Sequence, residues 1–242
     1  MSDLIRVQTE GNVTRLTLCR PEKGNSLSSE MVQALAAAVE RCHTDGTAML
    51  VLDAQGRNFC TGFDLGDLDR QTDDALMARF IRIELLLQAL QAAPFLTVAI
   101  GHGRHIGAGA DLFVACQRRV VIGEAAFRFP GAAFGLVLGT GRLSRIVGAV
   151  HACDWVGSGR WVEHDEALAR GLVTRAVDEA KTQALLDQFA QEGSRLDSTT
   201  RQAVYAASGH GRRSAQDMMA LVLSAARPGL RERIQGFRAA AN

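Results

Sequence analysis

The sequence predicts an α/β fold made of strand–strand–helix units, followed by a purely helical C-terminal segment. Three observations predict this fold. Apolar and alternating runs of strand length are interspersed with amphipathic runs before residue 180, the pattern beyond it is helical only, and 47% of the 242 residues are apolar. A chain of this size and composition can bury a large core without disulfides or structural metals.

The first unit is predicted to be a hairpin followed by a helix. Residues 5–7 and 13–18 alternate apolar and polar side chains on either side of Gly11-Asn12, which is typical of a two-stranded hairpin. Ser28 or Ser29 is expected to cap the next helix, because a serine hydroxyl can accept from a free N–H of the first turn. We expect this helix to end at Gly46.

Two continuous apolar runs, 48–52 and 96–100, predict strands covered on both faces. The segment between them, 74–92, has the spacing of a long amphipathic helix that ends before Pro94. The second apolar run leads into the glycine-rich segment 101–109, which we interpret as a turn at the start of a helix.

The later elements are predicted to be shorter. The sequence indicates two short strands around Gly123, three short helices and a last strand, at 120–122, 126–129, 142–147, 150–156, 163–170 and 172–177.

A domain boundary is predicted near residue 197. Residues 1–197 would form the core, and residues 198–242 a C-terminal helical region for oligomerisation. This region has more apolar positions than a small appendage can bury by itself, so we expect it to pack against a neighbouring subunit. The positions are Val204, Met218, Met219, Leu221, Val222, Leu223 and Ile234.

Composition excludes several classes of function. The chain has 27 basic and 26 acidic residues, and its net charge of +1 is too small to attract nucleic acid or a membrane surface. The five cysteines form no CxxC pair, which favours free thiols in a reducing cytoplasm. We expect neither a signal peptide nor a transmembrane helix, and therefore a cytoplasmic location.

Two glycine-containing segments, 58–64 and 101–109, each follow a predicted strand. Glycines at the start of a helix expose backbone N–H groups, and such groups can hold a developing negative charge. One N–H from each segment could thus form an oxyanion hole; alternatively, each segment is only a tight turn. A dinucleotide-binding loop is not expected, because Ile106 stands where the third glycine would be needed.

A set of short motifs occurs in order over roughly residues 5–178. The set resembles the crotonase superfamily, also called enoyl-CoA hydratase/isomerase. The motifs are Arg20-Pro21 with Asn25-Ser26-Leu27, the run 59–65, Gly103-x-x-Ile106-Gly107-Ala108-Gly109-x-Asp111-Leu112, Ala126-Phe127 with Pro130, Gly135-Leu136 with Gly139 and Gly141, Val147-Gly148, and Glu166-Ala167 with Gly171-Leu172-Val173.

The resemblance implies a crotonase-like spiral of ββα units, usually assembled as a homotrimer or a dimer of trimers. It implies an acyl-CoA thioester as ligand, with no separate cofactor because CoA is part of the substrate. The backbone N–H groups of Thr61 and Ala108 would form the oxyanion hole for the thioester enolate, and Lys23 would contact a CoA phosphate. The other implied substrate-binding positions are Cys60, Gly62, Phe63, Asp64, Gly107 and Gly131.

The chain departs from the family at the catalytic positions. Family hydratases use two glutamates, and the first position here holds Asp111, which has roughly 1.5 Å less reach. The second holds Gly131, which has no side chain. Hydration needs one group to deprotonate a water and another to deliver a proton, so ordinary two-glutamate hydration is not expected. The predicted helix start at Asp111 would lower its pKa, and both a catalytic and a structural role stay open.

His105 replaces a small residue of the family pattern. It could supply an acid or base near neutral pH; alternatively, it is a packing or hydrogen-bonding residue. His102 and His105 have no further ligands at suitable spacing, so no metal site is predicted.

We conclude that the sequence resembles an acyl-CoA enzyme of the enoyl-CoA hydratase/isomerase type, with altered acid/base residues. Two alternatives remain: a non-catalytic acyl-CoA-binding or assembly homologue, and a decarboxylase or thioester hydrolase on the same fold.

Overall fold

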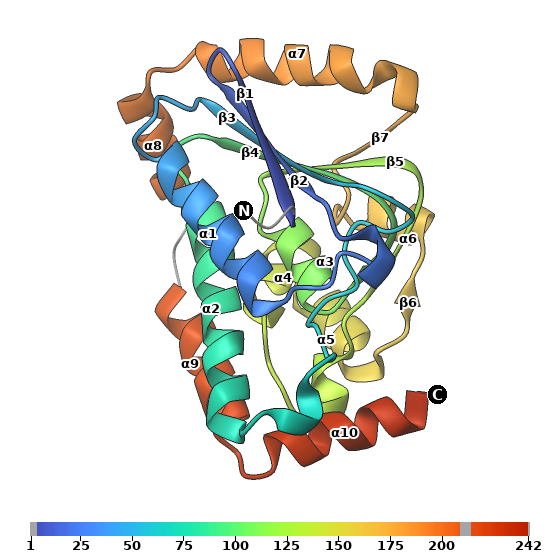
Figure 1. Cartoon of the computed structure of the whole chain (residues 1–242). Helices are drawn as coiled ribbons and strands as arrows, with labels where there is room; N and C mark the ends of the chain where they lie inside the picture. Colours follow the sequence, from blue (N-terminus) through green and yellow to red (C-terminus); the bar gives the residue numbers. More distant parts are fainter. Residues whose placement is uncertain (1–3, 209–213, 242) are drawn as a thin grey trace.

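A twisted sheet forms the centre of the computed structural model, which describes residues 4–208 and 214–241 (Figure 1). Neighbouring strands in the sheet follow the chain order from β1 to β6, and β7 pairs with β5. The pairs β1–β2 and β5–β6 are antiparallel, and the other pairs are parallel. The strands are β1 (Ile5–Glu10), β2 (Val13–Leu18), β3 (Met49–Ala54), β4 (Leu96–Ile106), β5 (Arg118–Arg128), β6 (Trp161–Val162) and β7 (Arg175–Val177).

Helices cover both faces of this sheet and continue beyond it. As predicted, Ser28 caps the first helix, where its hydroxyl accepts from the N–H of Met31 at 3.2 Å. The helices are α1 (Ser29–Cys42), α2 (Asp73–Gln91), α3 (Ala108–Val114), α4 (Thr140–Val147), α5 (Ala149–Ser158), α6 (His164–Ala169), α7 (Thr182–Ser194), α8 (Ser198–Ala207), α9 (Ser214–Ala225) and α10 (Leu230–Ala241), with short 3₁₀ helices at Pro21–Lys23, Leu68–Arg70, Pro130–Phe134 and Glu179–Lys181.

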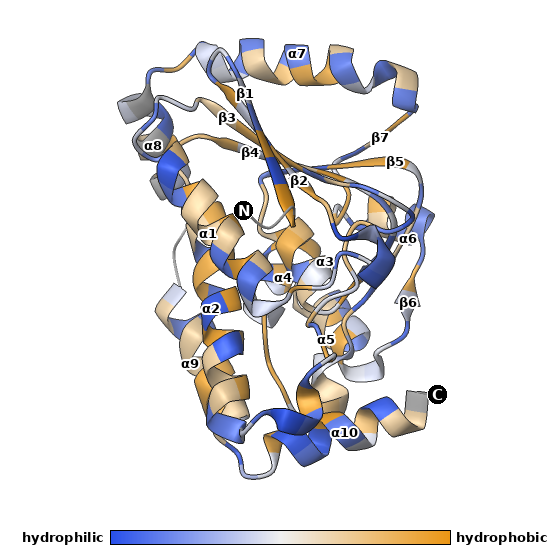
Figure 2. Cartoon of the chain, viewed as in Figure 1, coloured by the Kyte–Doolittle hydropathy of each residue, from blue (hydrophilic) through white to orange (hydrophobic). Residues whose placement is uncertain are grey.

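The hydrophobic core has two parts, one on each face of the sheet. Because successive side chains of a strand point to opposite faces, Leu50 and Leu52 of β3 join the larger core. Met49 and Val51 of the same strand join the smaller one, which also contains Phe189 of α7. Figure 2 shows the apolar central strands between these layers. The continuous apolar runs therefore mark strands covered on both faces, as expected.

The interpretation of segment 101–109 as a turn is wrong for its first six residues. Strand β4 continues to Ile106 and pairs with β5, with a register shift between Gly101 and Gly103. The glycines serve close packing within the strand: Gly103 has a φ of 60°, and a Cβ at Gly101 would overlap the ring of His105. The two short strands expected around Gly123 are likewise one continuous strand, β5.

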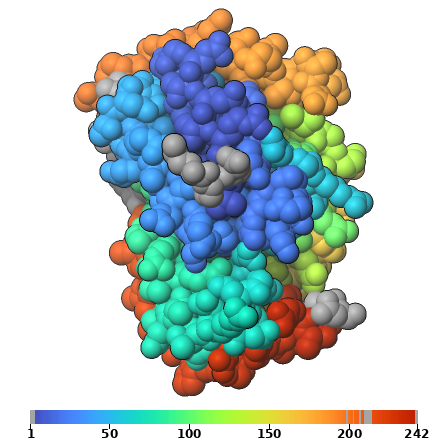
Figure 3. Space-filling model, in the orientation of Figure 1, coloured from blue at the N-terminus to red at the C-terminus, as the bar shows by residue number. Residues whose placement is uncertain are grey.

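The C-terminal helices pack on the rest of the chain. Figure 3 shows the C-terminal segment against α2 on one face of the molecule. Leu221 and Ile234 are buried within this chain, so the expectation that they contact a neighbouring subunit is wrong. Met219 and Leu223 of α9 are 58% and 66% exposed. The domain boundary near residue 197 remains a prediction.

No helix in the part of the chain that the structure describes has the length and apolar character needed to cross a membrane.

Candidate active site

A mostly apolar cavity of about 190 Å³ lies where the loop after β3, the start of α3, the 3₁₀ helix Pro130–Phe134 and α10 meet. It brings together most of the residues that the sequence singled out. These are Thr61, Gly62, Phe63, Gly107, Ala108, Asp111 and Gly131.

The two glycine-containing segments are held side by side by backbone hydrogen bonds. The N–H of Ile106 donates to the carbonyl of Cys60 at 3.0 Å. The N–H of Phe59 donates to the carbonyl of His102, also at 3.0 Å. Gly62 has a φ of 93°, and a Cβ there would lie only 2.5 Å from the carbonyl oxygen of Ile106. Glycine at this position therefore lets the two segments approach each other closely.

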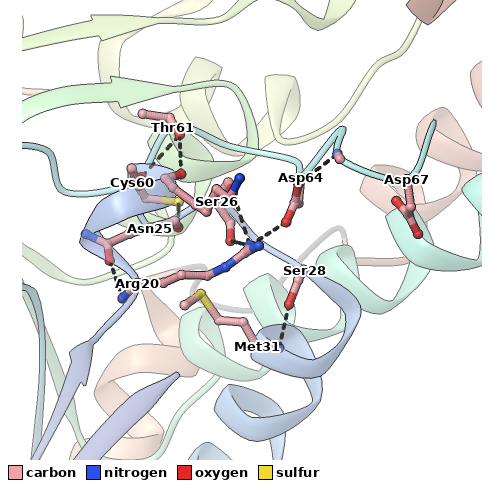
Figure 4. Close-up of polar contacts among 12 residues, drawn as sticks. Arg20, Asn25, Ser26, Ser28, Met31, Cys60, Thr61, Asp64 and Asp67 are labelled. Carbon is pink, nitrogen blue, oxygen red and sulfur yellow. Dashed lines mark hydrogen bonds and ion pairs between the residues drawn. The ribbon is translucent and has the colours of Figure 1, made fainter. Parts of the chain in front are cut away.

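Thr61 does not offer its backbone N–H to the cavity. This N–H donates to the carbonyl of Gly24 at 2.9 Å, and the Thr61 hydroxyl donates to the same carbonyl at 3.1 Å (Figure 4). An oxyanion donor must be free to meet the substrate oxygen. The assignment of the Thr61 N–H to the oxyanion hole is therefore wrong.

Phe63 carries a free backbone donor in this loop. The backbone groups on either side of this N–H both bond to Leu27. The carbonyl of Gly62 accepts from the N–H of Leu27 at 2.7 Å, and the N–H of Asp64 donates to the carbonyl of Leu27 at 3.2 Å. Because successive groups of an extended segment point to opposite sides, the Phe63 N–H points away from Leu27. It has no acceptor among the described residues, and Phe63 lines the cavity.

Ala108 offers a second free donor. It is the first residue of α3, where an N–H has no acceptor within the helix. Among residues 4–208 and 214–241 its N–H has no acceptor either. The N–H groups of Phe63 and Ala108 are thus two unpaired donors on residues that line the same cavity.

Asp111 presents a carboxyl group to this cavity. Asp111 is only 4% exposed, and its Oδ1 has no hydrogen-bond partner in the described part of the chain. Gly139 packs directly against the carboxylate, because a Cβ at this position would overlap Oδ1. The absence of a side chain at residue 139 therefore makes room for Asp111.

Burial raises the pKa of Asp111 well above its ordinary value; the nearby Arg142 opposes this and Glu84 adds to it. The expectation that the helix start lowers this pKa is wrong, because desolvation outweighs the dipole of a helix only seven residues long. Arg142 forms a salt bridge with Glu84 at 2.8 Å, and both side chains are at most 1% exposed. Asp111 thus has no ion-pair partner of its own in the described chain.

His105 does not line the cavity. Its imidazole is fully buried, with ring centroids 4.9 Å from Phe59, 4.8 Å from Phe113 and 4.4 Å from Phe127. Burial lowers the pKa of His105 to about 3, so the ring is neutral at physiological pH. The structure contradicts a catalytic role for His105, and the packing alternative accounts for its position.

The buried His105 leads to a prediction about acid stability. Its pKa is about 3 in the folded state and 6.5 in the reference state, so only the unfolded chain binds the proton between these values. The His105 contribution to the free energy of unfolding should therefore fall by about 1.4 kcal/mol per pH unit as the pH drops from 6.5 toward 3. His105→Leu should lack this contribution in denaturant unfolding measured at several pH values. Parallel pH profiles for the two proteins would contradict the prediction.

Three other predicted residues lie outside the cavity. Cys60 is buried beneath the loop, where its thiol donates to the carbonyl of Asn25 at 3.1 Å and burial raises its pKa to about 12. Asp64 pairs with Arg20 (Figure 4). Cys60 and Asp64 therefore shape the loop and do not line the cavity. Lys23 is exposed and borders a separate hollow beside Arg20, so its contact with a CoA phosphate stays a prediction.

No group of three or more His, Cys, Asp or Glu side chains in the described ranges is arranged to hold a metal ion. The structure therefore offers no cluster of this kind beside the cavity.

Comparison with known proteins shows the family of the chain. The family model described as enoyl-CoA hydratase/isomerase matches residues 8–228. A Bacillus subtilis protein named a probable enoyl-CoA hydratase is 33% identical over 192 residues, which cover 74% of this chain and 73% of that protein. The chain belongs to the enoyl-CoA hydratase/isomerase family, the crotonase superfamily.

Solved structures agree with this membership. A Bordetella parapertussis structure assigned to the enoyl-CoA hydratase/isomerase class has a TM-score of 0.95 and 41% sequence identity, and the match covers 98% of both chains. An enoyl-CoA hydratase from Bacillus halodurans has a TM-score of 0.83 at 21% identity, over 96% of this chain and 99% of that one, and shows the shared fold. The crotonase-like α/β fold expected from the sequence is thereby confirmed.

Proposed function

We propose that the chain binds an acyl-CoA thioester in the cavity and moves a proton next to the thioester carbonyl, as a double-bond isomerase. One observation carries this proposal: Asp111 is the only ionisable side chain among the described residues that line the cavity. A proton shift within one substrate needs one base, which first removes the proton and then returns it.

The two backbone donors would stabilise the negative charge of the enolate. The thioester oxygen gains negative charge when the proton leaves the adjacent carbon C2, and the N–H groups of Phe63 and Ala108 are free to meet it. Both donors are fixed in place by neighbouring hydrogen bonds, so no reorganisation is required as the charge develops.

Asp111 is the proposed acid/base. In its ionised form the carboxylate takes a proton from C2 of a 3-enoyl thioester, and the neutral acid returns it to C4, which gives the 2-enoyl thioester. Its raised pKa makes the ionised form a stronger base than an exposed aspartate.

The region around Gly131 supports isomerisation over two-carboxylate hydration. Gly131 supplies no acid, and a Cβ there would lie 3.1 Å from the carbonyl oxygen of Leu136, a tight contact. A second carboxylate for water activation is therefore absent from the described cavity wall.

Assembly as a homotrimer or a dimer of trimers is part of the proposal. The support is the exposed apolar surface of α2 and α9, where Leu85 is 53% exposed alongside Met219 and Leu223.

The test compares two substrates with the same protein. We expect 3-hexenoyl-CoA to be converted to its conjugated isomer, and crotonyl-CoA to gain water at least about 10²-fold more slowly. Butyryl-CoA should exchange its C2 protons with deuterated solvent, as followed by nuclear magnetic resonance. Hydration as fast as isomerisation would contradict the assignment, and binding without any exchange would identify a non-catalytic acyl-CoA-binding protein.

A further inference from the structure

One wall of the cavity comes from the last helix of the chain. Ile234 and Phe237 of α10 line the cavity together with Phe134. Ile234 is 1% exposed, and the ring centroids of Phe134 and Phe237 are 5.3 Å apart. These three side chains, called the α10 wall below, are apolar and line the same cavity.

The N-terminus of α10 is held by a carboxylate from α2. Asp73 accepts hydrogen bonds from the backbone N–H groups of Gly229, Leu230 and Arg231 at 2.9, 3.0 and 2.8 Å. These N–H groups lie where a helix has no acceptors of its own, and a negative charge is favourable there. The bond from Arg231 is the main cause of a lowered pKa at Asp73, so the carboxylate stays ionised at neutral pH.

A second contact fixes α10 to the 3₁₀ helix that carries Phe134. The guanidinium of Arg233 donates to the carbonyls of Phe134 at 2.7 Å and Gly135 at 3.1 Å. The backbone that carries the α10 wall is therefore positioned from both sides, through Asp73 and through Arg233, and α10 cannot shift as a unit without breaking these bonds.

The size and polarity of the cavity limit the acyl group. A dry apolar cavity of about 150 Å³ accommodates benzene, and this cavity measures about 190 Å³. The polar side chains in its described lining are those of Thr61, Asp111 and Thr140. A carboxylate or hydroxyl on the acyl tail would thus lose its hydration without a partner beside the α10 wall.

We propose that the α10 wall sets the acyl specificity of this protein. Its substrates are CoA thioesters of apolar acyl groups with no more than about eight carbons, and Ile234 and Phe237 determine this limit. The inference rests on the proposed function, because it takes the cavity to hold the acyl group of a CoA thioester.

The experiment measures the affinity of the full chain for saturated acyl-CoA thioesters by titration calorimetry. In the wild type, affinity should rise by about fourfold per buried methylene from butyryl-CoA to octanoyl-CoA, and should fall for dodecanoyl-CoA. Phe237→Ala should raise the affinity for dodecanoyl-CoA, relative to that for butyryl-CoA, by at least about tenfold. Arg238→Ala, on the same helix but outside the cavity lining, is the control and should leave the length profile unchanged.

Further variants separate folding from specificity. Ile234→Ala removes a buried side chain, so its thermal unfolding is compared with that of the half-buried Phe237→Ala. Asp73→Asn leaves the residues that line the cavity unchanged. By releasing α10, it should weaken the discrimination between octanoyl-CoA and dodecanoyl-CoA. Equal affinity of the wild type for octanoyl- and dodecanoyl-CoA, or an unchanged length profile in Phe237→Ala, would overturn the inference. Failure of every acyl-CoA to bind would instead overturn the proposed function.

Discussion

Asp111→Asn is expected to lower the isomerisation rate by about 10²- to 10⁴-fold, or roughly 3–5 kcal/mol of barrier. Asparagine has nearly the same shape but cannot take up and return a proton. The affinity for saturated acyl-CoA should therefore stay within a few-fold, while kcat falls. Both are measured on the same preparations, by conversion of 3-hexenoyl-CoA and by titration calorimetry with butyryl-CoA.

The pH dependence gives this prediction a second readout. Burial raises the pKa of Asp111, and the ionised form is the base, so the rate should increase with pH through this raised value. Thr140→Val alters a polar but non-ionisable residue of the same cavity and should keep this pH profile. If Asp111→Asn retained more than a tenth of the wild-type rate, another group would have to move the proton.

Ala108→Pro is expected to lower kcat by about 10²- to 10³-fold, because proline has no N–H to hold the enolate oxygen. Residue 108 is the first residue of α3, a position where proline fits a helix well. The substitution thus removes one backbone donor and leaves the helix in place. Circular dichroism and thermal unfolding would verify that the fold is retained.

Ala108→Ser is the matched control for this prediction. It changes the side chain at the same position and keeps the N–H, so kcat should stay within a few-fold of the wild type. Equal losses of activity in the two variants would mean that the side chain, and not the backbone donor, matters. A wild-type rate in Ala108→Pro would exclude Ala108 from the oxyanion hole.

Much of the fold could be predicted from local patterns. The hairpin β1–β2, the serine cap of α1, the amphipathic helix α2 and the buried strand β3 all depend on periodicity and on residues close in sequence. The sequence wrongly predicts a turn at the glycine-rich end of β4, because glycine marks both turns and close strand packing. Only the partners of Gly101 and Gly103, namely His105 and Arg57, distinguish the two.

The site was predicted less completely. The sequence motifs point to both loops that border the cavity and to Ala108, but they favour Thr61 where the structure leaves the N–H of Phe63 free. Neighbouring N–H groups of an extended loop point to opposite sides, so the free one depends on pairing with Leu27, which lies 36 residues earlier. Composition and spacing carry no information on this register.

The sequence by itself determined the family, the order of the central elements and the lack of a side chain at Gly131, since these depend on residue identity and local periodicity. The tertiary structure alone decided the chemistry of the remaining groups. Packing buries His105 among aromatic rings and Asp111 against Gly139, and desolvation then moves their pKa values away from the ordinary ones. It also brings α10 to the cavity, because burial and proximity come from contacts between residues distant in sequence.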